Sequence, residues 1–250
     1  MSAAASNYPL WEQLSDLKAN YKWVDLTHEL SAETPHWYGF KPLGTEKLFD
    51  FDVAPMKVFQ YTTPGQYGTH ADVPGHFDAN GRLMEAIPVS EMAFPLCVID
   101  KSKAVAADND YALTKDDVLE WEAEYGQIPE GAFVAFRSDW SKRPAADFDN
   151  NDAEGHAHYP GWDLDCVKWL ADVRHVGAIG HETPDTDPAA CEAQTGFLAE
   201  GYILKADKLN VELLKDLDQV PAVGAIAFVT FPRLKGGTGF PTRVFAICPI

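Results

Sequence analysis

Alternation of apolar and polar residues marks β-strands along much of the chain. Residues 22–30 (KWVDLTHEL) and 56–62 (MKVFQYT) alternate in this way, as expected for strands with one buried face, because side chains two positions apart point to the same side of a sheet. Shorter, mainly apolar runs also read as strands, at residues 96–100, 133–136, 176–179, 223–231 and 243–247. The pattern therefore predicts a substantial β-sheet.

Helical spacing occurs at fewer places. The apolar residues within 10–17 predict a short amphipathic helix that packs on a partner subunit. Thr114 followed by Asp117 resembles a capping box, and Asp163 is suited to cap a helix that continues to residue 173. Several strands with a few inserted helices indicate a mixed α/β (α+β) fold rather than a regular βαβ repeat.

The chain reads as one domain over residues 1–250, with no internal repeat and no low-complexity linker. Residues 147–157 (DFDNNDAEGHA) form a polar, acidic segment that is the best candidate for a mobile loop, and a lid over substrate is one of its possible roles.

The charge balance excludes some classes of partner. The 250 residues carry 20 Lys and Arg against 38 Asp and Glu, a formal net charge of −18. Neutralisation of phosphates requires clustered cations, so we expect no nucleic-acid partner and no acidic membrane surface. At 46% hydrophobic and 12% aromatic residues, the composition is that of a folded globular protein.

The cysteines and the first residues suggest a cytoplasmic protein. No C-x-x-C pair occurs, so free buried thiols are expected at Cys97, Cys166, Cys191 and Cys248. The first residues, MSAAASNYPLWEQLSDL, show no basic stretch followed by an apolar one, and no run approaches the ~18 apolar residues of a membrane span.

Residues 66–77 (QYGTHADVPGHF) carry the candidate chemistry. On an extended strand His70 and Asp72 project to the same face, and the bend at Pro74 and Gly75 can return His76 to the same spot. Imidazole nitrogen and carboxylate oxygen together suit Zn²⁺, Mn²⁺ or Fe²⁺. From spacing alone, an ordinary hydrogen-bonded surface pair remains an alternative.

The stretch Gly68-Thr69-His70-x-Asp72-x-Pro74-x-His76 resembles the signature H-x-G-T-H-x-D-x-P-x-H of the cyclase-type metal-dependent hydrolases, the family of bacterial kynurenine formamidase and isatin hydrolase. The resemblance extends to residues 25–27 (DLT), 179–187 (IGHETPDTD) and 239–243 (GFPTR). It implies a swivelling β/β/α domain with a partly closed β-sheet and a few flanking helices. It also implies a homodimer in which each N-terminal segment helps the neighbour's site.

Departures from the family pattern narrow the resemblance. The first histidine of the signature is Gln66 here. A later His and, twelve positions on, a Glu complete the two-metal site of the formamidases, and an ungapped match puts Gln194 and Ala206 at these positions. The chain is thereby similar to the isatin hydrolase branch, which implies that His70, Asp72 and Gln194 hold one divalent metal, Mn²⁺ first and Zn²⁺ second. An ordinary surface amide is the alternative for Gln194.

His76 is the candidate proton-transfer group, because an imidazole can accept a proton from water and return it to a leaving nitrogen. A structural histidine bonded to Asp72 is the alternative. Aromatic side chains flank the motif and could wall a flat aryl substrate, although some are equally plausible core residues: Trp37, Tyr38, Phe59 and Tyr61. The resemblance favours Trp37 and Phe59 among them.

Two further segments carry weaker signals. His181 and Glu182 follow a predicted strand and could orient a ligand or lie near substrate, and we count His181 among the substrate-binding candidates. Arg243 is more typical of a structural partner for carboxylates than of a group that steers product.

Together with these residues, the resemblance implies a metal-dependent amidohydrolase that opens the ring amide of a small aryl substrate, with isatin to isatinate as the leading reaction. His70 and Asp72 would then serve both as ligands and in catalysis, with His76 moving the proton. An arylformamidase acting on N-formylkynurenine and a lactone hydrolase share the tetrahedral intermediate and remain alternatives. A non-catalytic homologue that only binds metal or ligand is the third.

Overall fold

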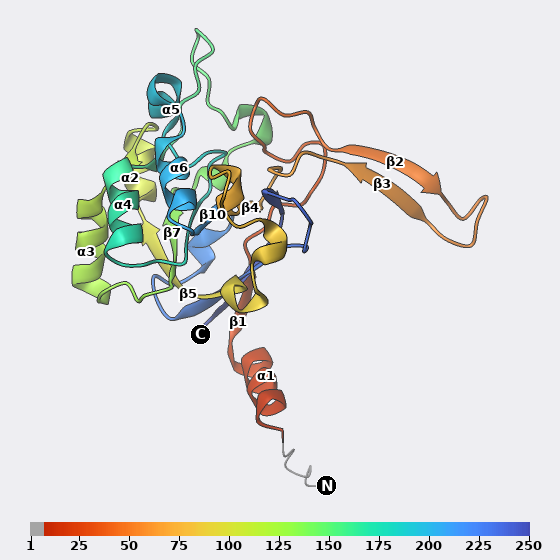
Figure 1. Ribbon diagram of the computed structural model, residues 1–250, viewed down its shortest axis with the longest axis horizontal. Coiled ribbons are helices and arrows are strands. Elements are labelled where there is room, and N and C mark those ends of the chain that lie inside the picture. The colour runs from red at the N-terminus through yellow and green to blue at the C-terminus, as the bar shows by residue number, and fades with distance from the viewer. Residues whose placement is uncertain (1–7) are drawn as a thin grey trace.

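A computed structural model describes residues 8–250, which fold around a curled β-sheet (Figure 1). Within these residues the sheet has nine strands in the order β1-β13-β11-β5-β7-β9-β10-β4-β12. In that order the strands are Lys22–Asp25, Arg243–Cys248, Ala225–Thr230, Ala93–Asp100, Phe133–Arg137, Ala178–His181, Leu209–Glu212, His70–Asp72 and Gly239–Pro241. Each apolar run that the sequence pattern assigned to a strand contributes to this sheet.

The four central strands, β5, β7, β9 and β10, run parallel to one another, and the outer strands pair antiparallel. Strand β7 shows why the central runs lack alternation. Phe133 and Ala135 enter the core on one face of the sheet, whereas Val134 and Phe136 enter the core on the other. A strand buried on both faces has no polar side, so its sequence is continuously apolar.

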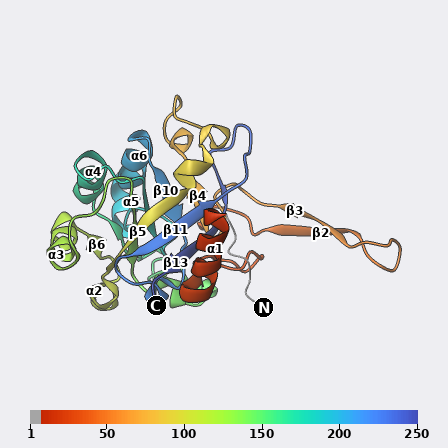
Figure 2. The same cartoon turned by 90° about the horizontal axis from the view of Figure 1, so that it is seen from below.

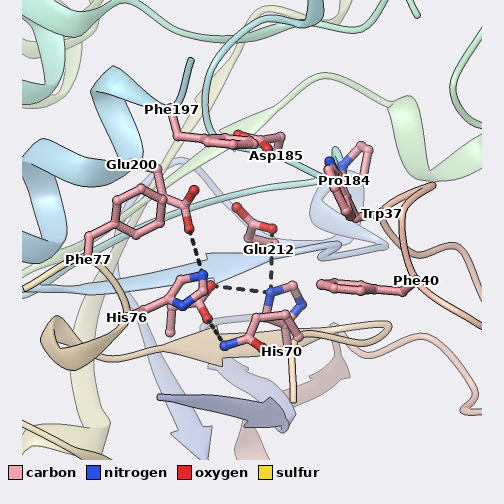
Figure 3. Close-up of a pocket in the computed structure, with 12 residues that line it drawn as sticks. Trp37, Phe40, His70, His76, Phe77, Pro184, Asp185, Phe197, Glu200 and Glu212 are labelled. Carbon is pink, nitrogen blue, oxygen red and sulfur yellow. Dashed lines mark hydrogen bonds and ion pairs between the residues drawn. The ribbon is translucent and has the colours of Figure 1, made fainter. Parts of the chain in front are cut away.

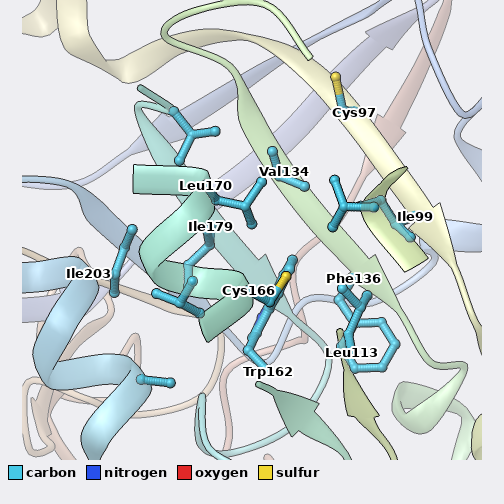
Figure 4. Packing of buried hydrophobic residues seen from close by; sticks show 14 of the residues in the cluster. Cys97, Ile99, Leu113, Val134, Phe136, Trp162, Cys166, Leu170, Ile179 and Ile203 are labelled. Carbon is cyan, nitrogen blue, oxygen red and sulfur yellow. The ribbon is translucent and has the colours of Figure 1, made fainter. Parts of the chain in front are cut away.

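Helices cover one face of the sheet. They are α2 (Ser102–Ala107), α3 (Lys115–Tyr125), α4 (Leu164–Asp172), α5 (Ala189–Thr195) and α6 (Leu198–Lys205). Their apolar residues pack with those of β5, β7 and β9 in the core that Figure 4 shows around Trp162 and Leu170. The predicted caps are confirmed: Thr114 and Asp117 form a capping box on α3, and the Asp163 side chain accepts a hydrogen bond from the Cys166 amide at the start of α4.

On the opposite face the sheet curls, so that strands from its two ends pack against each other. Residues from both ends of the strand order share one core there, with Val244 of β13 and Ala71 of β4 as examples. The end of β1 reaches the chain after β10, where Thr27 forms a bridge with Leu214 and the Lys215 amide donates to the Leu26 carbonyl at 3.1 Å. The expected partly closed sheet with flanking helices is thus confirmed.

Two segments project from this body (Figures 1 and 2). Strands β2 (Gly44–Phe49) and β3 (Val58–Thr62) form a hairpin arm, residues 44–62, that extends away from the sheet. Helix α1 (Pro9–Asn20) lies where the spacing predicted a helix, and none of its residues is buried. The predicted strand over residues 22–30 ends earlier, at Asp25, because the following residues turn away to the bridge at Thr27.

Short elements connect the rest. A small two-stranded sheet pairs β6 (Ala112–Leu113) with β8 (Gly161–Trp162). Single turns of 3₁₀-helix lie at Pro74–His76, Met84–Ala86, Val89–Met92, Trp140–Lys142, Ala145–Asp147 and Leu217–Gln219. No helix in the part of the chain that the structure describes is long and apolar enough to cross a bilayer.

The four cysteines are free, as expected, but Cys191 is exposed whereas the other three are buried. Cys191 lies on the short helix α5, whose buried residue is Ala189. Residues 1–7, which begin the segment that we read as lacking a leader, lie outside the described residues.

Candidate active site

Strand β4 positions the two residues at the centre of the site. His70 and Asp72 are both buried, and β4 is paired on both sides, by β10 and by β12. This pairing fixes the backbone, so the two side chains leave the same face as their spacing predicts. His70 stands directly opposite Glu212 of β10 in the antiparallel register, which brings a second carboxylate to the imidazole.

The His70 ring is held with Nε2 toward the carboxylates. Its Nδ1 lies 2.8 Å from the Gly68 carbonyl, which can only accept, so Nδ1 carries the proton. Nε2 lies 3.2 Å from Asp72 Oδ2 and 3.4 Å from Glu212 Oε2. Among the described residues, neither His70 Nε2 nor Asp72 Oδ2 has a hydrogen-bond partner, and both atoms are buried. A nitrogen lone pair facing carboxylates is stable only with a proton or a cation between them.

The charges of this group shift its protonation. Burial alone would lower the pKa of His70, but Asp72 and Glu212 outweigh it and raise the pKa to about 9. Burial would likewise raise the pKa of Asp72, yet the neighbouring His70 holds it below its usual value. In the absence of a cation, His70 therefore keeps a proton that neutralises part of the carboxylate charge.

A second group of carboxylates adjoins the first. Asp185, Glu200 and Glu212 offer oxygens that lie within 4.8 Å of one another, and Glu212 belongs to both groups. Burial, and next the charge of Glu212, raise the pKa values of Asp185 and Glu200 well above normal. His76 reaches this group from the 3₁₀ turn after β4, with its Nε2 3.8 Å from Glu200 Oε1 (Figure 3).

Neighbouring side chains hold Glu212 and Glu200 in place. Asn210 and Thr186 donate to Glu212 Oε1 at 3.0 and 3.2 Å, which leaves Oε2 facing His70. Asp187 accepts hydrogen bonds from the backbone amides of residues 198–200 and so anchors the start of α6, the helix that carries Glu200. Ligand groups fixed in this way by further hydrogen bonds are typical of metal sites.

The polar groups form one end of a cavity of about 210 Å³. Its other walls are apolar and come from four segments of the chain, through Trp37, Phe40, Phe77, Pro184 and Phe197 (Figure 3). Phe77 and Phe197 meet edge to face with ring centroids 6.1 Å apart, and Trp37 meets Phe40 in the same manner at 5.2 Å. A flat aromatic molecule fits such a space, with its polar edge toward His70.

Several residues singled out from the sequence lie elsewhere. Gln194 is exposed on α5 and lines a different cavity, together with Asp149 and His158, so the structure does not bring it to His70. Phe59 and Tyr61 lie on the hairpin arm and do not line the cavity of their own chain. The ungapped sequence match favoured Gln194 because it takes no account of where α5 lies in space.

Three other residues named in the sequence analysis contact groups of the protein itself. His181 is fully buried, and its Nε2 lies 3.4 Å from Glu212 Oε1. Glu182 accepts hydrogen bonds from Ser138 and Ser141 and holds the loop after β7. Arg243 forms an ion pair with Asp25 on the surface. Residues of the segment 147–157 line the same cavity as Gln194.

Sequence reasoning missed Glu200 and Glu212. They are twelve positions apart, the spacing between the later His and Glu of the formamidases that the chain resembles, and they stand six residues after Gln194 and Ala206. The spacing was a usable signal, but a lone Glu within a helix or a strand gives no local sign of burial. The alternative of a surface pair for His70 and Asp72 is excluded by their burial.

Comparisons with known proteins agree with this geometry. Residues 24–188 match the Cyclase family model. The chain is 34% identical to isatin hydrolase of Roseibium aggregatum over 212 residues, which cover 81% of this chain and 80% of the relative. Isatin hydrolase A from Labrenzia aggregata, solved with benzyl benzoate, superposes with a TM-score of 0.90 at 32% identity, covering 97% of this chain and 100% of that one. An isatin hydrolase bound to the product analogue thioisatinate gives a TM-score of 0.89 at 29% identity, covering 99% and 100%.

Proposed function

The chain belongs to the cyclase family, and on this premise we propose that it hydrolyses the ring amide of isatin to give isatinate, with one divalent metal ion per subunit. The observation that carries the proposal is a pair of unpartnered buried atoms, His70 Nε2 and Asp72 Oδ2, at the polar end of an aromatic cavity. The similarity to isatin hydrolases over most of the chain supports the substrate.

His70, Asp72 and Glu212 are the residues that fit a divalent cation. Each offers one ligand atom, all three atoms lie within 4.8 Å of one another, and all three residues are buried. One nitrogen with two carboxylate oxygens suits Mn²⁺, which we propose first, and Zn²⁺ second. When bound, the metal supplies a Lewis acid that activates water and polarises the amide carbonyl. Glu212 takes the place in this set that the sequence had suggested for Gln194.

The remaining residues bind substrate and move protons. Phe77 and Phe197 on one side and Trp37 and Phe40 on the other hold the aryl ring and exclude water from its faces. Water adds its oxygen to the amide carbon and gives up one proton to a base, the ring C–N bond breaks, and the freed nitrogen takes that proton, while the proton of the new carboxyl group goes to solvent. His76 is the group we propose for this transfer, because its side chain is about one third exposed (32%) and its Nε2 faces Glu200 at 3.8 Å.

The test follows the loss of the visible absorbance of isatin. We expect metal-dependent loss with Mn²⁺-loaded protein and none after treatment with a chelator. His70→Ala should abolish both Mn²⁺ binding and turnover, whereas His158→Ala, a histidine of the outer loop paired with Asp110, should change neither. Retained turnover in His70→Ala would contradict the assignment. Turnover of N-formylkynurenine or of a lactone, but not of isatin, would assign the alternative substrate.

We also propose that the protein acts as a homodimer. Leu10 and Trp11 of α1 are 76% and 64% exposed, and Tyr61 on the hairpin arm is 62% exposed. Apolar side chains in two projecting segments need a partner to cover them, and an arm that reaches a second copy would carry Phe59 and Tyr61 to the other cavity. Light scattering should give twice the mass of the chain. In a mixed dimer of one His70→Ala and one Tyr61→Ala subunit, the intact His70 site would receive the intact arm, so activity should be recovered. A monomer that is fully active would refute the proposal.

The compartment is a further proposal. All four cysteines are free, which supports a reducing environment such as the cytoplasm. Cell fractionation with an antibody to the protein would test it, and recovery outside the cytoplasmic fraction would refute it.

A further inference from the structure

The two oxygens of the Asp72 carboxylate have different surroundings. Oδ1 accepts a hydrogen bond from Gln66 Nε2 at 3.2 Å. Oδ2 has no hydrogen-bond partner within residues 8–250, and it faces His70 Nε2 at 3.2 Å. The carboxylate is therefore not free to rotate: one oxygen is held by the amide, and the other is presented to the place that we propose for the metal.

Gln66 uses its amide nitrogen, not its oxygen, toward this group. The same Nε2 also donates to Thr238 Oγ1 at 3.3 Å, so both amide hydrogens are directed to fixed acceptors. An amide NH₂ has no lone pair available for a cation, whereas its hydrogens can fix a carboxylate. At a position where the family signature has a histidine, this chain has a hydrogen-bond donor.

Gly239 makes room for this hydrogen bond. It lies opposite Asp72 in the pairing of β12 with β4. A Cβ at residue 239 would lie 2.5 Å from Gln66 Nε2, and closer still to Asp72 Oδ1. The same position approaches the chain before Gln66, because a Cβ at Gly65 would lie 2.5 Å from the Gly239 carbonyl oxygen. Residue 239 does not have a positive φ, so the glycine is required for space and not for backbone conformation.

We propose that Gln66 is a positioning residue rather than a metal ligand, and that Gly239 provides the space in which its amide locks Asp72 Oδ1 so that Oδ2 faces the cation. This inference rests on the metal site of the proposed function. It explains how one carboxylate oxygen can be aimed at a cation site in a cavity crowded with other carboxylates.

The test measures Mn²⁺ affinity of metal-free protein by calorimetry, together with the thermal unfolding midpoint. Gln66→Met keeps the length of the side chain and removes the donor, and it should weaken Mn²⁺ binding about 10- to 100-fold, the usual effect of a lost hydrogen bond to a ligand. Gly239→Ala should weaken binding to a similar extent. The control is Gly44→Ala on β2, where a Cβ meets nothing closer than 3.7 Å and affinity should stay within about twofold of the wild type.

The double variant separates positioning from ligation. If both changes act through one hydrogen bond, Gln66→Met with Gly239→Ala should bind within about twofold of the weaker single variant. Multiplied effects would overturn the inference, as would unchanged affinity in Gln66→Met. It would equally fail if Gly239→Ala kept its affinity while Gln66→Met lost it, because Gly239 would then not provide the space for the hydrogen bond. Isatin turnover of the wild type is measured in parallel, so an inactive wild type that binds Mn²⁺ refutes only the substrate, and a wild type that binds no divalent cation refutes both.

Discussion

Binding of Mn²⁺ to the metal-free protein should displace about one proton from His70. The neighbouring carboxylates of Asp72 and Glu212 overcome the effect of burial and raise the pKa of this imidazole to about 9. A nitrogen that binds a metal must be unprotonated, so the cation and the proton compete for Nε2.

The magnitude follows from the pKa. Near neutral pH, about two units below that value, roughly 1% of the metal-free molecules carry an unprotonated His70. The apparent affinity for Mn²⁺ at pH 7 should then be about 100-fold weaker than at a pH above 9, and each pH unit between these limits should strengthen it about tenfold.

Calorimetry in two buffers with different heats of ionisation counts the protons released. We expect about one near neutral pH, and protons lost from Asp185 or Glu200, whose pKa values are also raised, would add to this number. His158→Ala should give the wild-type count. A release below about half a proton, or an affinity that does not change between pH 7 and pH 8, would refute the reasoning.

The same shift affects the stability of the metal-free protein. Because the pKa of His70 is higher in the folded state than the ordinary value of 6.5, its charged form contributes stability that is complete below pH 6.5. This contribution is lost as the pH rises through about 9 and amounts to roughly 3 kcal/mol. Urea unfolding in the presence of a chelator at pH 6 and above pH 9 measures it. His70→Ala should flatten this part of the pH dependence.

Three further changes test the walls and supports of the site. Gly39→Ala places a Cβ in overlap with Trp37 Cζ3, so the indole must move, and the KM for isatin should rise about tenfold with little effect on kcat. An unchanged KM would mean that Trp37 is not a wall. Asp187→Ala removes the acceptor at the start of α6 and should lower the free energy of unfolding by about 1–2 kcal/mol. It should also slow turnover, because the helix that carries Glu200 would lose this anchor. If only the stability falls, Asp187 has a structural role alone. Thr114→Ala breaks the capping box of α3 and should lower the free energy of unfolding in urea by about 1 kcal/mol with normal turnover. A catalytic defect would contradict its place outside the residues that line the cavity.

The local elements could be predicted from the sequence because their signals are local. The capping residues of α3 and α4 lie within three positions of the amides that they bind. The apolar run of β7 is continuous because its side chains enter the cores on both faces of the sheet. Such features depend on neighbours along the chain, which the sequence displays directly.

Half of the candidate site could be predicted in the same way. His70 and Asp72 are two positions apart on an extended strand, so their side chains share a face whatever the rest of the fold does. His76 follows them after a tight turn, and the structure places it at the same cavity. Spacing along one strand was sufficient for His70 and Asp72, and the turn directly after that strand was sufficient for His76.

The other half was decided by tertiary structure. Glu212 faces His70 only because β10 pairs antiparallel with β4 in one register, and Glu200 arrives on a helix whose start is held by Asp187. Gln194, which the aligned spacing favoured, is on the outer surface of α5 and faces another cavity. The sequence by itself determined which strand carries the chemistry. Strand pairing and helix packing decided which distant carboxylates join it, because an isolated Glu carries no local mark of the partners that burial will give it.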